Sequence, residues 1–206
     1  MAEYLEIHAD NPQPRLIKQA VQLIGQGAVT AFPTDSCYAL GCQIGDKEAL
    51  ARIRRVRELD KKHHFTLICR DLSELAAYAQ VSNRTYRLLR AHTPGAYTFI
   101  LPASREVPKR LHNPKRKTIG LRVPANNILE SLLFELQQPL LSVTLILPNE
   151  TQPLTSADEI IDALSKQIDL VIDGGDCGTA PTTVVDLETA VPEILRTGRG
   201  DPQPFI

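Results

Sequence analysis

The sequence predicts an α/β fold in which helices flank a twisted, mixed β-sheet. Short apolar segments typical of buried strands alternate with longer segments whose apolar residues recur at helical spacing. Some predicted strands follow each other without a helix between them, which favours both parallel and antiparallel neighbours in one sheet. The chain has 206 residues, 43% of them hydrophobic, and no tryptophan. We therefore expect a single domain over residues 1–206 with an aliphatic core.

The pattern places each element in turn. Strands are predicted at residues 4–8, 28–32, 65–69, 97–101, 119–123, 140–147, 170–172, 182–185 and 194–196. Helices are predicted at residues 14–26, 46–56, 72–79, 83–92, 128–136 and 156–165. Asp46 is placed to cap the second helix, and Ser156 and Glu159 have the spacing of a capping box. Residues 148–153 are expected to form a loop.

Charge is distributed unevenly along the chain, although the net charge is only −1. Residues 1–129 contain 20 Lys and Arg against 11 Asp and Glu, whereas residues 130–206 contain 3 against 13. Such segregation predicts a positively charged, concave cleft suited to a partner that carries phosphate.

The sequence argues against several classes of protein and site. No apolar run approaches the ~20 residues of a membrane-spanning helix, and the N-terminus lacks the features of a signal peptide. We therefore expect a cytoplasmic protein that does not bind membranes. The four cysteines form no CxxC pair and do not space with the five histidines as zinc ligands would, so we expect them in the core. Neither a P-loop nor a GxGxxG segment is present.

The most informative segment is PTDSCYALG, from Pro33 to Gly41. It follows the strand predicted at residues 28–32, and Pro33 lacks the backbone donor that further sheet pairing needs. Four polar side chains then gather where this strand ends: Thr34, Asp35, Ser36 and Tyr38. In open α/β sheets, ligands bind at such strand ends.

This segment resembles the PTDT-x-YGLG motif of the YrdC-like family, the threonylcarbamoyl-AMP synthases. Four later segments resemble further motifs of the family, in the family's order. They are PGAYTFIL at residues 94–101, GLRVP at 120–124, DGG at 173–175 with TTVVD at 182–186, and LRTG at 195–198. The resemblance covers nearly the whole chain, and within the family it is strongest to the YciO branch.

The resemblance implies a YrdC-like fold and a protein that handles nucleotides. The family uses ATP, with magnesium, together with threonine and bicarbonate to make an intermediate for tRNA modification. The resemblance thus implies a synthase-like nucleotidyltransferase, intact or degenerate, without a tightly bound cofactor. It would act on L-threonylcarbamoyl-AMP or a related acyl-adenylate, by synthesis or by hydrolysis. Such chemistry needs positioning and neutralisation of charge rather than a protein nucleophile.

Four residues are expected to bind the substrate. The family's threonine that matches Thr34 contacts substrate, and Tyr38 lies in the same segment; a threonine that merely caps a turn is the alternative. The arginine that matches Arg122 holds the threonine carboxylate, a role that suits a forked guanidinium. A solvated arginine is the simpler interpretation. Ser142 offers a hydroxyl where the family often has a small residue.

Five residues are expected to bind the nucleotide. The glycine-rich turn before Thr182 and Thr183 is either an ordinary turn or a site whose amides and hydroxyls hold phosphate, and the resemblance puts Thr182 near the substrate. Arg196 matches an arginine that contacts the nucleotide. Arg57 and Thr144 fall on the first positions of the family's K-x-R and S-x-N pairs, which implies a catalytic role for both as well.

The second position of each pair departs from the family. Leu59 stands in place of arginine and Ile146 in place of asparagine, and neither can hydrogen-bond to phosphate or to a zwitterion. Lys61, Lys62, His63 and His64 either compensate or form only a charged turn. We therefore expect weaker synthase activity than in a family member with both pairs intact.

A basic loop between the strands at 97–101 and 119–123 predicts another partner. It contains Lys109, Arg110, Lys115, Arg116 and Lys117. The loop is either a solvated surface or contacts RNA phosphates without base specificity, and the family's similarity to double-stranded RNA binders favours contact. The alternative function is thus a double-stranded RNA- or tRNA-binding protein with a degenerate synthase site.

Overall fold

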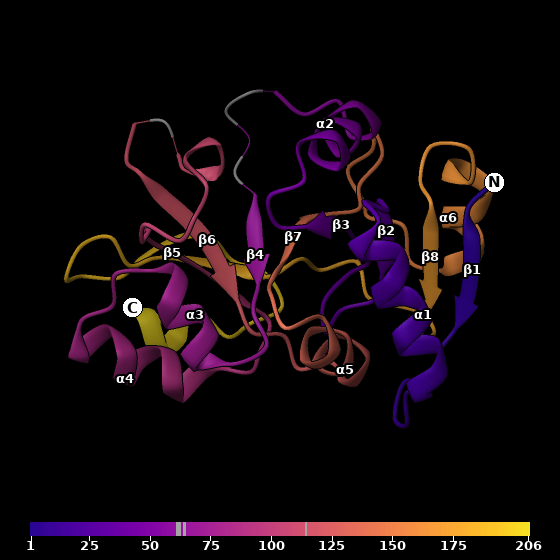
Figure 1. Cartoon of the computed structure of the whole chain (residues 1–206). Coiled ribbons are helices and arrows are strands. Elements are labelled where there is room, and N and C mark those ends of the chain that lie inside the picture. Colours follow the sequence, from indigo (N-terminus) through magenta and orange to yellow (C-terminus); the bar gives the residue numbers. More distant parts are fainter. Residues whose placement is uncertain (61–62, 64, 114) are drawn as a thin grey trace.

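The computed structural model describes residues 1–60, 63, 65–113 and 115–206. Ten strands of this part form one sheet (Figure 1). They are β1 (Glu3–Glu6), β2 (Thr30–Phe32), β3 (Ala39–Gln43), β4 (Thr66–Ile68), β5 (Tyr97–Pro102), β6 (Thr118–Arg122), β7 (Leu140–Thr144), β8 (Leu170–Asp173), β9 (Thr183–Asp186) and β10 (Glu193–Arg196). The α-helices are α1 (Pro14–Gly25), α2 (Lys47–Val56), α3 (Leu72–Tyr78), α4 (Asn83–His92), α5 (Asn127–Leu136) and α6 (Ala157–Leu164). Short 3₁₀ turns occur at Lys109–Leu111 and Gln203–Phe205.

The sheet is mixed, as the sequence predicts. Its strands lie in the order β1-β8-β2-β3-β7-β4-β6-β5-β9-β10. β8 pairs in parallel with β1 and β2, β4 with β6, and β5 with β9, whereas the other neighbours are antiparallel. The α/β class with a mixed sheet flanked by helices is therefore confirmed.

Two buried clusters cover the two faces of the sheet. α1 and α5 lie side by side and pack against Phe32, Leu170 and Ile172 (Figure 1). α2 and α6 belong to the other cluster, which contains Ala31 and Val171. Because successive residues of a strand point to opposite faces, this alternation along β2 and β8 places the two helix pairs on opposite sides of the sheet.

Helix ends follow the sequence signals. The Asp46 carboxylate accepts hydrogen bonds from the backbone N–H groups of Glu48 and Ala49, both at 2.9 Å. Ser156 and Glu159 form the predicted capping box at the start of α6. Local polar residues thus set where these helices begin.

One strand of the sheet escaped the sequence analysis. β3 lies inside the PTDSCYALG segment and continues beyond it, and it pairs with β2 and β7. Its centre is Gly41, where an added Cβ would lie 2.5 Å from the Leu141 carbonyl oxygen and 2.9 Å from the Phe32 ring. Glycine has low strand propensity, so the sequence pattern did not predict a strand here. β7 also ends at Thr144, earlier than predicted.

None of the helices in the described part of the chain is long and apolar enough to cross a membrane.

Candidate functional site

A cavity of about 540 Å³ opens over the middle of the sheet, and we call it the central cleft. Its lining comes from β3, β7, β4, β6, β5, β9 and β10, from the turn before β3 and from the segment before β4. Cleft-facing residues alternate along two of the strands, as in Thr98 and Ile100 on β5 and Gly120 and Arg122 on β6. Tyr38, Arg57, Arg122, Ser142, Thr144, Thr182 and Arg196 all line the cleft. Seven of the sequence-predicted residues are thus brought together.

The turn before β3 is organised by Thr34. Its Oγ1 accepts hydrogen bonds from the backbone N–H groups of Ser36 (3.0 Å) and Cys37 (3.2 Å) and donates to the Cys37 carbonyl (2.7 Å). Thr34 is buried behind the lining, whereas Ser36, Cys37 and Tyr38 line the cleft. The Tyr38 hydroxyl donates to the Gly175 carbonyl at 2.9 Å, which ties the turn to the glycine-rich loop. Thr34 thus holds the turn together, and its contact with substrate stays a prediction.

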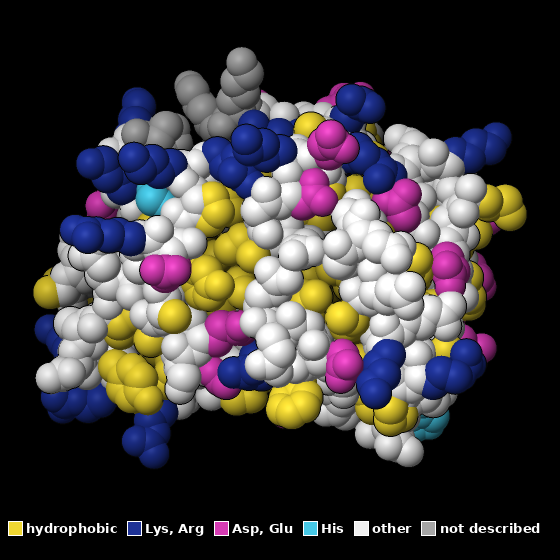
Figure 2. All heavy atoms as spheres, in the orientation of Figure 1, with side chains coloured by type: hydrophobic (Ala, Val, Ile, Leu, Met, Phe, Trp, Pro, Cys, Tyr) yellow, Lys and Arg dark blue, Asp and Glu magenta, His cyan; other side chains and the backbone are white. Residues whose placement is uncertain are grey.

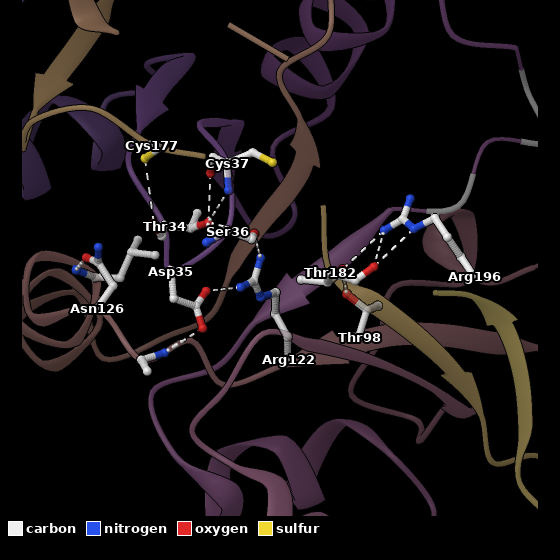
Figure 3. A network of polar contacts seen from close by, with 12 residues as sticks. Thr34, Asp35, Ser36, Cys37, Thr98, Arg122, Asn126, Cys177, Thr182 and Arg196 are labelled. Carbon is white, nitrogen blue, oxygen red and sulfur yellow. Dashed lines mark hydrogen bonds and ion pairs between the residues drawn. The ribbon is translucent and has the colours of Figure 1, made fainter. Parts of the chain in front are cut away.

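Arg122, at the end of β6, projects between this turn and the far wall of the cleft (Figure 3). Only 6% of the residue is exposed, and its Nη2 forms an ion pair with Asp35. The second Asp35 oxygen accepts the Ala125 backbone N–H at 3.0 Å. Burial lowers the pKa of Arg122, and the Asp35 charge opposes that shift. Its buried Nε has no hydrogen-bond partner among the described residues, which leaves a donor for an anionic ligand.

Arg196 and Thr182 form the opposite wall (Figure 3). Nε and Nη2 of Arg196 donate to the Thr182 carbonyl at 3.0 and 2.9 Å, and Thr182 Oγ1 lies 2.8 Å from Thr98 Oγ1. Thr183 is placed differently. It is buried outside the lining, and its hydroxyl donates to the Gly200 carbonyl and accepts the Gly198 N–H at 2.9 Å. Its hydroxyl is thus used to hold the chain's final turn.

Arg57 follows α2 directly and reaches across the cleft to β7. Its Nε donates to the Thr144 carbonyl at 3.0 Å. Ser142 on the same strand donates to the Thr66 carbonyl at 3.2 Å. Burial lowers the pKa of both Arg57 and Arg196, and no carboxylate of the described residues offsets the shift. These two guanidiniums would therefore be stabilised by a bound anion.

The two departures from the family pattern occupy different places. Ile146 lines the cleft, whereas Leu59 packs half-buried against the core that contains α2. His63 also lines the cleft, with its ring edge-on to Phe65 at 5.7 Å between centroids. Lys61, Lys62 and His64, the other candidates for compensation, lie outside the described residues.

The sequence analysis missed part of the lining. Thr66 and Thr98 add hydroxyls, and Phe65, Ile100 and Val184 add an apolar wall. A threonine near the start of an otherwise apolar strand was the available signal for the first two. For the apolar residues no signal existed, because core residues follow the same pattern.

The basic loop lies outside the lining of the central cleft. Figure 2 shows Lys and Arg side chains gathered over α2 and over the loop between β5 and β6. Lys109, Lys115 and Lys117 are exposed, and none of the three pairs with a carboxylate of the described residues. Arg110 donates to the Gly45 carbonyl, and Arg116 forms ion pairs with Asp186, at 2.7 Å, and with Glu188. Three lysines of this loop are therefore open to a partner, while its two arginines are engaged.

The cleft combines cations, hydroxyls and an apolar wall. The cations of such a lining can neutralise the charge of a phosphate or carboxylate, while its apolar wall can pack against a planar ring. In the part of the chain that the structure describes, no group of three or more His, Cys, Asp or Glu is arranged to hold a metal ion.

Comparisons with known proteins extend these observations. The family model of Sua5, YciO and YrdC, described as telomere recombination, matches residues 22–198. The Escherichia coli protein YciO is 52% identical over 206 residues, with 100% of both chains covered. Its crystal structure has a TM-score of 0.97 to this chain, again over 100% of both.

Two more distant proteins have names that state an activity or a ligand. A threonylcarbamoyl-AMP synthase of Vibrio vulnificus is 28% identical over 187 residues, which covers 88% of this chain and 98% of the synthase. P. abyssi Sua5, solved in complex with L-threonine, is 25% identical with a TM-score of 0.87, over 96% of this chain and 58% of Sua5.

Proposed function

Since the chain belongs to the Sua5/YciO/YrdC family, we propose that its central cleft binds an adenine nucleotide and acts on L-threonylcarbamoyl-AMP or a related acyl-adenylate. Synthesis and hydrolysis are both open to this site. The observation that carries the proposal is the convergence of Arg57, Arg122 and Arg196 on one cavity of about 540 Å³. Cavities of this size suit drug-sized ligands.

The nucleotide phosphates are assigned to Arg57 and Arg196. Both guanidiniums are partly removed from water without a compensating carboxylate of the described residues. A phosphate would supply that charge through charge-assisted hydrogen bonds. The Thr182 hydroxyl accepts a hydrogen bond from Arg196 at 3.2 Å, and Thr144, whose carbonyl accepts from Arg57, also lines the cleft. Arg57 and Thr144, joined across the cleft, are the residues we assign to catalysis by charge neutralisation.

The acyl end is assigned to Arg122, with Tyr38 and Ser142 nearby in the lining. Its Nε–H, which has no partner among the described residues, can donate a hydrogen bond to a carboxylate oxygen while Asp35 keeps the guanidinium in place. The complex of P. abyssi Sua5 with L-threonine supports an amino-acid ligand in this family. Thr34 contributes by holding the turn that carries Asp35, and Thr183 by holding the chain behind Thr182.

Synthase activity is expected to be low, because Leu59 and Ile146 cannot donate hydrogen bonds. Each lost charge-assisted contact costs ~1.5–3 kcal/mol, or roughly ten- to a hundredfold. Restoring a hydrogen-bond donor to the cleft lining with Ile146→Asn should raise turnover. Parental turnover equal to that of the V. vulnificus synthase would contradict this expectation.

Calorimetry with ATP and with AMP tests nucleotide binding. We expect Arg57→Gln and Arg196→Gln to weaken binding about tenfold or more. Arg84→Gln on the exposed side of α4 is the matched control and should bind as the parent does. If the folded parent produces no heat at millimolar nucleotide, the enzymatic proposal fails.

The reaction itself is tested with two incubations. One contains ATP, magnesium, threonine and bicarbonate, and the other contains threonylcarbamoyl-AMP alone, with products identified by mass. Product in the first indicates synthesis, and breakdown above the spontaneous rate in the second indicates hydrolysis. If the protein binds nucleotide but gives neither product, it is a nucleotide-binding protein and the enzymatic part of the proposal is wrong.

A second candidate function is nonspecific binding of double-stranded RNA or tRNA by the basic loop. The favouring observation is that Lys109, Lys115 and Lys117 are exposed and unpaired within the described chain. Binding should weaken steeply with salt, and the triple alanine variant of these lysines should flatten the salt slope. Arg116 stays unchanged in this variant because it pairs with Asp186. Equal binding by the variant and the parent would remove this candidate.

A further inference from the structure

A second cavity, of about 590 Å³, lies at the carboxyl ends of β4 and β6, and we call it the α4–α5 crevice. These two strands are parallel neighbours, and the chain leaves them in different directions, into α3 from β4 and into α5 from β6 (Figure 1). Such a divergence of helices at neighbouring strand ends is where ligands bind in α/β sheets. The crevice shares no lining residue with the central cleft.

Opposite charges face the crevice from two different helices. Arg90 lines it from α4 and Glu130 from α5, and neither forms an ion pair with any described residue. A second pair, Arg70 with Asp71, also lines it but is already joined at 3.0 Å. Figure 2 shows acidic and basic side chains next to each other in the region between α3 and α5. The charged lining thus balances to zero, which disfavours a simple anion and favours a ligand that carries both signs.

The remaining lining fits the same ligand class. α5 begins at this crevice, with Asn126 as its cap, Asn127 as its first residue and Glu130 in its first turn. Tyr86, one turn before Arg90 on α4, gives an aromatic wall together with Pro94 and Pro124. A carboxylate therefore has Arg90, an ammonium has Glu130, and an apolar side chain has Tyr86 and the prolines.

We propose that the α4–α5 crevice binds a zwitterionic α-amino acid, with its carboxylate toward Arg90 and its ammonium toward Glu130. This binding does not depend on the nucleotide function of the central cleft, since the two cavities have separate linings. It is also separate from the substrate position assigned to Arg122.

The test is a titration of the ¹⁵N-labelled full-length protein with four pools of the twenty common amino acids, followed by backbone amide NMR. At least one pool should shift the amide signals of Tyr86, Arg90, Asn126 and Asn127 in a saturable way. The active amino acid is then identified singly. Arg90→Gln and Glu130→Gln should each weaken its binding about tenfold. Arg87→Gln on α4 and Glu135→Gln on α5 are matched controls and should leave it unchanged.

Chemical variants of the active amino acid test the two charges separately. The N-acetyl derivative lacks the ammonium and the methyl ester lacks the carboxylate, so each should bind at least tenfold more weakly than the parent compound. The proposal is wrong if no pool moves these amides, if Arg90→Gln and Glu130→Gln bind as the parent protein does, or if either derivative binds equally well. Amide shifts confined to Tyr38, Thr144 and Thr182 would place the amino acid in the central cleft and also overturn it.

Discussion

The central cleft and the basic loop both gather positive charge, but they hold it in opposite ways. In the cleft, Arg122 is 6% exposed, paired with Asp35 and fixed between two walls of the sheet. In the loop, the lysines are exposed to solvent. A buried cation is costly unless an anion or a hydrogen-bond acceptor meets it, whereas an exposed one is solvated by water. Basic side chains therefore favour a defined anionic ligand in the cleft, whereas at the loop they favour contacts with a charged partner that weaken as salt is added.

The largest expected effect comes from breaking the buried ion pair. Arg122→Ala leaves the Asp35 carboxylate, whose side chain is 9% exposed, without its partner. Loss of one member of a buried pair costs about 3–5 kcal/mol. Urea unfolding should show this loss, and the double variant Arg122→Ala/Asp35→Ala should recover part of it. A loss below about 1 kcal/mol for the single variant would show that the pair is effectively solvated, like the loop.

The next effect tests the tight packing of the strands that form the cleft. Gly41→Ala would place a Cβ against the Leu141 carbonyl and the Phe32 ring, and overpacking typically costs about 1–3 kcal/mol. Gly25→Ala is the control, since nothing lies within 4 Å of its added Cβ. Thermal unfolding should separate the two variants. Equal melting temperatures would mean that β3 can shift to admit the methyl group.

A smaller effect on stability is expected within the basic loop, where Arg116 pairs with a buried carboxylate and the exposed lysines do not. The Arg116 side chain is 42% exposed, but its partner Asp186 is 4% exposed. Arg116→Gln should therefore cost about 1 kcal/mol, a value limited by solvent screening. Lys115→Gln removes the same charge without a buried partner and should not change the unfolding midpoint measurably. Equal destabilisation by both variants would mean that net charge, not the Asp186 contact, sets the effect.

The effect that is smallest at neutral pH concerns Cys177, whose thiol lies 3.6 Å from the Thr34 carbonyl oxygen, and it develops only as the pH is raised. Burial raises the pKa of Cys177 from its usual 9.0 to about 11. The folded protein then holds this proton more tightly than the unfolded chain, so stability falls as pH rises from about 9 to about 11. Alkylation of Cys177 by iodoacetamide near pH 8 should also be slower than that of a free thiol. Cys177→Ser removes the signal, and reaction at the free-thiol rate would contradict the raised pKa.

Much of the fold and part of the candidate site could be predicted from the sequence. The spacing of apolar residues placed the six helices, and Asp46 and Ser156 marked two of their starts, because caps act over three residues. The motif residues Tyr38, Arg122, Thr182 and Arg196 were expected near a ligand, and the structure places all four in the lining of one cleft. The chemical roles that we assign to them stay predictions.

Tertiary structure decided which of these residues line the cleft. Thr34 and Thr183 carry the same hydroxyl group as Thr182, yet both are buried outside the cleft lining. For Thr183 the reason is a hydrogen bond to the backbone carbonyl of Gly200, 17 residues later in the chain. The ion pair of Arg122 with Asp35 joins residues 87 positions apart. At Gly41, β3 packs closely against residues of its two neighbouring strands, Phe32 of β2 and Leu141 of β7. Local sequence determines helix caps and the alternation of strands, since those interactions span a few residues. Which face meets solvent, a ligand or the core depends on contacts that form only when distant strands pair.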